Sequence, residues 1–152
     1  MCGTDRQQDD GLRIFPGPIE NSSTIAALWL PTASLAGESG VIKTEILWST
    51  LDCTGALTLV APPKGVTTVL GEFTVSIVDT VKVGEQCVVI GWPLGSDSRK
   101  HLAGTAIYAP HSRLVVLSRA VWLAGGIRKH LELKQGAIAS IRTKTSKTAP
   151  PK

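Results

Sequence analysis

A single carboxylate lies in the middle of a strongly apolar segment, and it is the residue from which we start. The segment runs from Lys43 to Leu57, KTEILWSTLDCTGAL, and contains Asp52. Its apolar side chains spread around the helical wheel, which is typical of a buried helix with little solvent-exposed surface. An ionised carboxylate there is costly unless it is paired, hydrated in a cleft or used in chemistry. We therefore expect Asp52 to lie in or near the protein interior.

The start of the same helix carries a second kind of group. The N–H groups at Lys43, Thr44 and Glu45, together with the helix dipole, can polarise a carbonyl group, and the Thr44 hydroxyl is expected to cap the helix. A carboxylate can act as a general base or as a nucleophile. Thr44 and Asp52 are eight residues apart, about 12 Å along a helix, too far to act on one carbonyl group from one helix. The spacing therefore favours a site shared across a two-fold interface.

The elements that must position these groups are mainly β-strands. Turn residues and alternating β-favouring stretches predict strands at residues 12–19 and 24–30 before the helix and at 69–81, 85–94, 99–108 and 113–123 after it. The last four strands are joined by short turns and must run antiparallel, because parallel neighbours need long crossovers. The sequence thus predicts an α+β fold in which a curved antiparallel sheet wraps around one apolar helix. The edges of such a sheet favour dimerisation.

Length and composition limit the class of protein. The chain has 152 residues, 43% of them hydrophobic, which suits one domain with a core. It has neither an apolar run long enough to span a membrane nor a segment of signal-peptide type. Three cysteines at unrelated spacings match no zinc or disulfide pattern. We expect a cytoplasmic protein that needs no metal and no other cofactor.

Charge divides the chain into a body and a tail. Residues 128–152 hold seven Lys/Arg and one acid, so the tail carries +6 and residues 1–127 carry −2. A slightly acidic body argues against a nucleic-acid partner. We predict a flexible N-terminus at 1–10, a folded domain at 11–126 and a basic, partly disordered tail at 127–152, with one short helix at 127–139.

This order of elements, with Leu51-Asp52 in a central helix, resembles the hotdog fold, and in closer detail hotdog proteins of the acyl-CoA thioesterase type from actinobacteria. The resemblance implies a homodimer built by joining two sheets edge to edge, often paired again into a tetramer. It implies active sites at the dimer interface and acyl thioesters of coenzyme A or a carrier protein as substrates. It rests on residues 10–18 (DGLRIFPGP), 47–53 (LWSTLDC), 88–95 (VVIGWPLG), 99–108 (RKHLAGTAIY) and 119–122 (RAVW).

In a thioesterase of this kind, Asp52 is the candidate base or nucleophile, and the helix start at Thr44 polarises the thioester carbonyl. Candidate substrate contacts are Lys43, Glu45, Thr54, Arg99 and Lys100, the last two as partners for the phosphates of coenzyme A together with Arg119. Each has a structural alternative. Asp52 would be a hydrogen-bonded carboxylate, Thr54 a packing residue, Glu45 an acid favoured by the helix dipole, and the basic residues a solvated surface.

Departures from the family keep a second function open. The loop before the helix lacks the His-Gly-Gly segment of many hotdog thioesterases, since Val41-Ile42-Lys43 separates Gly40 from the helix. The alternative is a non-catalytic hotdog protein that binds an acyl thioester or serves as a scaffold. A dehydratase is a weaker option, because the expected His-Phe-Pro type segment is missing and His101 suits packing. Cys53, beside Asp52, is expected to have a raised pKa and to pack in the core.

Overall fold

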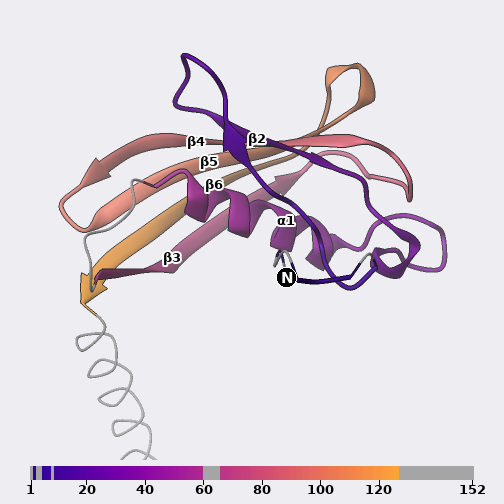
Figure 1. Ribbon diagram of the computed structural model, residues 1–152, viewed down its shortest axis with the longest axis horizontal. Helices are drawn as coiled ribbons and strands as arrows, with labels where there is room; N and C mark the ends of the chain where they lie inside the picture. Colours follow the sequence, from indigo (N-terminus) through magenta and orange to yellow (C-terminus); the bar gives the residue numbers. More distant parts are fainter. Residues whose placement is uncertain (1, 3–4, 8, 60–65, 127–152) are drawn as a thin grey trace, which may run out of the picture.

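The structure is a computed structural model that describes residues 2, 5–7, 9–59 and 66–126. It confirms the predicted architecture of one antiparallel sheet and one long helix (Figure 1). The predicted tail at 127–152, with its short helix, lies outside the described residues. The elements are β1 (Gly17–Pro18), β2 (Ile25–Trp29), a 3-10 turn (Ala33–Leu35), α1 (Thr44–Leu57), β3 (Val66–Ile77), β4 (Cys87–Asp97), β5 (Lys100–Ala109), a second short turn (Pro110–Ser112) and β6 (Arg113–Gly126).

The six strands lie in the order β1-β2-β4-β5-β6-β3, and every neighbouring pair is antiparallel. β4, β5 and β6 form successive hairpins, as their short turns predict. The connection from β3 to β4 is different. β3 pairs with β6 from Val66 opposite Gly126 to Ile77 opposite Val116, so the chain crosses the sheet before β4 begins. β3 is therefore an edge strand.

The first predicted strand, residues 12–19, is wrong for most of its length. Only Gly17 and Pro18 pair with a neighbour, opposite Ala26 and Ile25 of β2. Arg13 adopts a left-handed backbone with φ of 51°, which interrupts an extended chain. Leu12 and Ile14 nevertheless bury their side chains in the core, so the apolar pattern reflects burial without strand pairing.

α1 lies along one face of the curved sheet (Figure 1). The helix buries one face, made of Leu47, Thr50, Leu51, Thr54 and Gly55, at the spacing expected for a stripe that faces a sheet. The expectation of a helix buried nearly all round is wrong for this chain alone, because Trp48 is 38% and Leu57 58% exposed.

Two glycines let α1 approach the sheet closely. A Cβ added to Gly91 of β4 would lie 2.8 Å from Thr58 Cγ2 and 3.0 Å from Thr54 Cγ2. One added to Gly55 would lie 3.5 Å from Thr105 Cγ2 of β5. The main core fills the rest of the space between helix and sheet. Its largest fully buried apolar side chains are Trp29, Ile14, Leu51, Ile107, Val81, Val89, Val115 and Val116.

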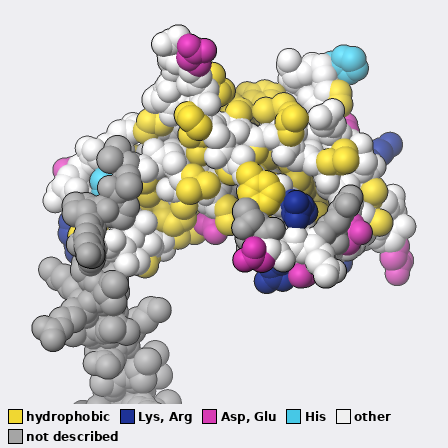
Figure 2. All heavy atoms as spheres, in the orientation of Figure 1, with side chains coloured by type: hydrophobic (Ala, Val, Ile, Leu, Met, Phe, Trp, Pro, Cys, Tyr) yellow, Lys and Arg dark blue, Asp and Glu magenta, His cyan; other side chains and the backbone are white. Residues whose placement is uncertain are grey.

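The molecular surface retains many hydrophobic side chains. In Figure 2 they gather across the middle of the face shown, while most charged side chains lie toward its margins. Along β3, Val69, Leu70 and Ile77 are between 36% and 39% exposed. Trp48 of the helix meets Phe73 of β3 edge-on, with ring centroids 5.5 Å apart. An exposed apolar band thus joins the edge strand to the outer side of α1.

The contact at Gly91 gives a first prediction. Gly91→Ala should lower the free energy of unfolding by about 1–3 kcal/mol, because the new methyl group forces α1 away from β4. Gly17→Ala is the matched control, since a Cβ there meets no atom within 4 Å. Urea unfolding followed by tryptophan fluorescence measures both. Equal stabilities of the two variants would contradict the close packing of α1 on β4.

Candidate functional site

The start of α1 presents two free backbone donors. Lys43 is the capping residue and is extended, with no side-chain cap, and its N–H donates to the Leu35 carbonyl at 3.2 Å. The prediction that Thr44 caps the helix is wrong, because Thr44 is already the first helical residue. The N–H groups of Thr44 and Glu45 have no acceptor among the described residues, and both residues are exposed. They are suited to bind an oxyanion at the positive end of the helix dipole.

Asp52 is not among the helix residues that are buried against the sheet, and its side chain is half-buried. Its Oδ1 atom is buried and has no hydrogen-bond partner within the described part of the chain. Burial raises the pKa of this carboxyl group above its ordinary value, because desolvation disfavours the charged form. A half-buried carboxyl group with an unused oxygen and a raised pKa is suited to accept a proton from water.

Thr54 faces the opposite way from Asp52. It is fully buried, its hydroxyl donates to the Thr50 carbonyl at 3.2 Å, and its methyl group packs at Gly91. The Thr50 hydroxyl likewise donates to the Ile46 carbonyl at 2.9 Å. Hydroxyl groups bonded to the preceding helical turn are satisfied locally. In this arrangement Thr54 packs the helix against β4 and does not share a surface with Asp52.

The basic candidates lie at the other end of the sheet. Arg99 is in the turn between β4 and β5, and Lys100 opens β5. Both are exposed, and the Arg99 carbonyl accepts the Ala124 N–H at 2.8 Å. Lys43 and the first turn of α1 lie near Val81, at the opposite end of the molecule (Figure 1). One chain thus brings together Lys43, Thr44 and Glu45 but keeps Arg99 and Lys100 apart from them.

Cys53, next to Asp52, has low chemical reactivity. Burial raises the pKa of Cys53 to about 11, and the Cys2 thiol beside it adds to the rise. The thiol is therefore protonated at neutral pH and is a poor nucleophile. The described residues contain no group of three or more His, Cys, Asp or Glu side chains placed to hold a metal ion. No helix in the described part of the chain has the length and apolar character to cross a membrane.

Comparison with solved structures identifies the fold as the hotdog fold. No protein-family model matches the sequence, and neither does any curated protein. A thioesterase from Haemophilus influenzae superposes with a TM-score of 0.67 at 15% identity, covering 76% of this chain and 80% of that one. A hypothetical thioesterase from Streptococcus pneumoniae, solved with coenzyme A, gives 0.61 at 13% identity over 68% and 82% of the chains.

A third similar structure contains a thioester. It is the smu.793 protein from Streptococcus mutans, solved with acetyl-CoA bound, and it gives a TM-score of 0.62 at 9% identity over 74% of this chain and 89% of that one. At these identities the likeness shows the fold alone. The fold prediction is confirmed, and the architecture is one that other proteins use to hold coenzyme A or its acetyl thioester.

The environment of Asp52 predicts how stability depends on pH. Its pKa is raised in the folded chain, so the folded state holds this proton to a higher pH than the unfolded state does. The contribution is therefore favourable in acid and is lost as pH rises through the folded pKa. Asp52→Asn places a neutral group at this position, so the variant does not lose stability as pH rises. Its Tm should therefore exceed that of the wild type at neutral pH, and the difference should shrink in acid. Thermal unfolding at pH 4 and pH 7 measures this, and a lower Tm for the variant at neutral pH would contradict it.

Proposed function

We propose that this protein hydrolyses acyl-coenzyme A, or the same thioester on an acyl carrier, at a site shared by the two chains of a homodimer. The proposal is carried by one observation: Asp52 Oδ1 is buried on the same helix as the N–H groups of Thr44 and Glu45, and none of these groups has a hydrogen-bond partner among the residues that the structure describes. The fold supports it, because similar solved structures include named thioesterases and proteins solved with coenzyme A or acetyl-CoA.

In the proposed reaction, the thioester carbonyl accepts hydrogen bonds from the Thr44 and Glu45 N–H groups. Asp52 of the other chain either takes a proton from the attacking water or attacks the carbonyl carbon itself to form a mixed anhydride that water then hydrolyses. The carbon–sulfur bond breaks, coenzyme A leaves as its thiol after protonation, and the acyl group leaves as a carboxylic acid. Charge that develops on the carbonyl oxygen is stabilised by the amides and the helix dipole.

The dimer is proposed from the free edge of the sheet. β3 is 12 residues long and leaves one row of backbone groups unpaired, which a second β3 can satisfy. The exposed side chains of Val69, Leu70 and Trp48 lie beside this edge and would be covered by such pairing. A two-fold axis at β3 makes the two helices antiparallel, so that the start of one helix faces the middle or end of the other.

The same two-fold symmetry accounts for the distance between the basic candidates and the helix start within one chain. Arg99 and Lys100 lie beyond the end of α1 in their own chain, and an antiparallel copy turns this end toward the partner's helix start. There they are suited to meet the phosphates of coenzyme A, with Lys43 supplying further positive charge. Thr54, which is buried against β4, is left with a packing role in this proposal. A tetramer remains compatible with the proposal and adds nothing to its chemistry.

Hydrolysis of a panel of short, long and aromatic acyl-CoAs, followed with a thiol reagent, tests the reaction. The wild-type protein should turn over at least one member of the panel. Asp52→Asn should lower kcat by at least about 100-fold, the usual size of a lost general base. Glu20→Gln changes an exposed acid in the turn between β1 and β2 and should retain full activity.

The outcomes separate the two candidate functions. If a folded wild-type dimer hydrolyses no thioester but binds acyl-CoA, the protein is a binding module. If it neither hydrolyses nor binds thioesters, the scaffold alternative replaces the thioesterase. Unchanged turnover in Asp52→Asn would remove Asp52 from the reaction.

The proposed interface predicts a change in oligomeric state. Leu70→Lys introduces a charge beside the free edge of β3 and should weaken self-association by at least about tenfold. Ile19→Lys is the control, because Ile19 is 43% exposed, close to the 39% of Leu70, but lies beside the short strand β1. Sedimentation velocity over a range of concentrations measures both. Equal dissociation of the two variants would rule out an interface at β3.

A further inference from the structure

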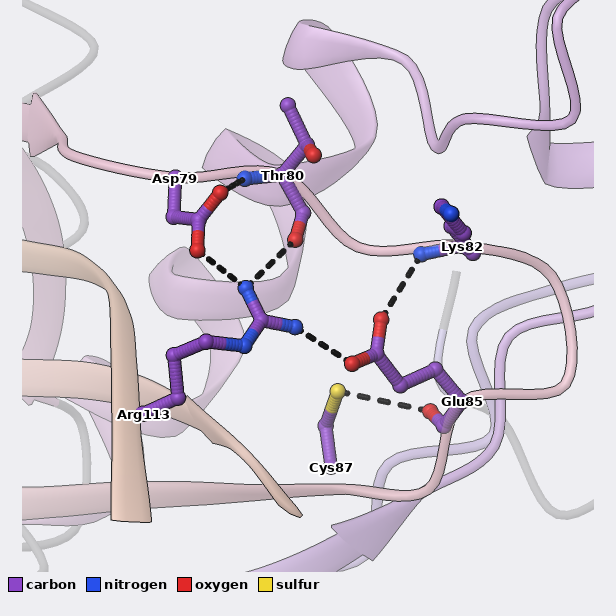
Figure 3. A network of polar contacts seen from close by, with 6 residues as sticks. All are labelled: Asp79, Thr80, Lys82, Glu85, Cys87 and Arg113. Carbon is purple, nitrogen blue, oxygen red and sulfur yellow. Dashed lines mark hydrogen bonds and ion pairs between the residues drawn. The ribbon is translucent and has the colours of Figure 1, made fainter. Parts of the chain in front are cut away.

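Arg113 lies at the centre of a polar network that no local sequence pattern indicates (Figure 3). It is the first residue of β6 and follows a tight turn in which His111 and Ser112 have φ of 61° and 57°. Its guanidinium donates from Nη1 to the carboxylate of Asp79 and from Nη2 to that of Glu85. Nη1 also donates to the Thr80 carbonyl at 3.2 Å. Arg113 thereby holds both ends of the connection formed by residues 79–85.

Each oxygen of the two carboxylates accepts a hydrogen bond within this network. The second oxygen of Asp79 accepts the Thr80 N–H at 2.7 Å, and that of Glu85 accepts the Lys82 N–H at 3.0 Å. These backbone hydrogen bonds and the nearby guanidinium lower the pKa of both acids. Both therefore stay ionised at neutral pH, and the network persists there. With each carboxylate bridging a backbone N–H and a guanidinium, residues 79–85 have little freedom to move.

The segment before α1, residues 40–43, is hydrogen-bonded to this connection. The Ile42 N–H donates to the Val81 carbonyl at 2.8 Å, and the Val83 N–H donates to the Gly40 carbonyl at 3.1 Å. Val41 and Lys82 pair as an isolated antiparallel bridge. Val81 is fully buried. Residues 40–42 thus form a short ladder with residues 81–83, and that ladder ends two residues before Thr44.

The other support of the segment is local. The Gly37 N–H donates to the Val41 carbonyl at 2.9 Å, and Lys43 donates to Leu35, so these bonds tie the segment only to the loop that leads into it. Among the described backbone contacts, the link from this segment to the body of the sheet runs through residues 81–83. Residues 79–85 are also anchored by the Asp79 N–H, which donates to the Val115 carbonyl, and by the Gly84 N–H, which donates to the Pro31 carbonyl. Arg113 adds the side-chain bonds that join the two ends of the connection, so the direction in which the chain enters α1 depends in part on Arg113.

We propose that Arg113 is a positioning residue for the oxyanion site. Through the connection at residues 79–85 it fixes residues 40–43, and so the direction of the free N–H groups of Thr44 and Glu45. This inference rests on the proposed thioesterase function. Displacement of a catalytic group by about 1 Å lowers rate by roughly 100-fold, whereas Arg99 and Lys100, the main proposed contacts of the coenzyme A phosphates, lie at the other end of the sheet from Arg113. Loss of Arg113 therefore acts on kcat and leaves KM nearly unchanged.

The test combines hydrogen exchange with kinetics in the full-length protein. Arg113→Gln should make the Ile42 and Val83 amides exchange at least about tenfold faster, while amides of β5 keep their wild-type protection. With the best acyl-CoA of the panel, kcat should fall by about 10- to 100-fold with KM within roughly twofold. Arg6→Gln is the control, because Arg6 forms a surface ion pair with Asp10 at 2.9 Å and should leave both readouts unchanged.

Two milder variants keep the proposal testable if Arg113→Gln does not fold. Glu85→Gln removes one of the two ion pairs, and Arg113→Lys keeps the charge but loses the planar fork. Each should change exchange and kcat in the same direction by a smaller amount. Faster exchange with unchanged kcat, or no change in either, would overturn the positioning role. A wild-type protein inactive on every thioester would overturn the proposed function and this inference with it, an outcome distinct from an active wild type with an equally active Arg113→Gln.

Discussion

The close packing of α1 on β4 and β5 is the contact on which the rest of the structure depends. Gly91 and Gly55 remove side chains where the helix and the sheet come nearest, and Leu51 and Thr54 fill the remaining space. A helix held by one face must turn its other face outward. Asp52 lies outside the buried face, and its Oδ1 atom is buried without a hydrogen-bond partner in the described part of the chain, so the packing that stabilises the domain also fixes the helix that carries this carboxyl group.

The elements could be predicted where local pattern decides them. The apolar segment from Lys43 to Leu57 predicts the helix, which begins at Thr44, and the strands around Ile107 and Val116 follow from runs of β-favouring residues. The sheet order could not be predicted, because nothing in β3 indicates that its partner is β6, whose paired residues lie 39 (Ile77 to Val116) to 60 (Val66 to Gly126) positions further along the chain. The failure at residues 12–19 has a similar origin, since apolar side chains are buried there by a backbone that Arg13 turns out of the strand conformation.

The candidate site was foreseen in part for physical reasons of the same kind. Apolar neighbours on the helix predict a desolvated Asp52, and the burial of Oδ1 agrees with this. They do not predict which side of α1 meets the sheet, because Trp48 and Leu57 are as apolar as the residues that are buried. Arg113 carries no signal at all in the sequence, since its acidic partners lie 34 and 28 residues earlier. Ion pairs at such separations follow from the folded topology and from no local spacing.

The two edges of the sheet differ in a way that limits how copies of this chain can add to one another. At one edge β3 offers 12 residues. At the other, β1 offers two, one of them Pro18 with no backbone N–H to donate, and residues 27–29 of β2, which β1 does not cover, add a further short stretch. Growth of a fibre needs two extendable edges on each subunit, so that a third chain finds a place after the second. Any assembly that joins through β3 uses the long edge of both chains and leaves outside only β1 and the short uncovered part of β2. Edge addition is therefore self-terminating at two chains, and the unequal edges protect the protein from open-ended polymerisation.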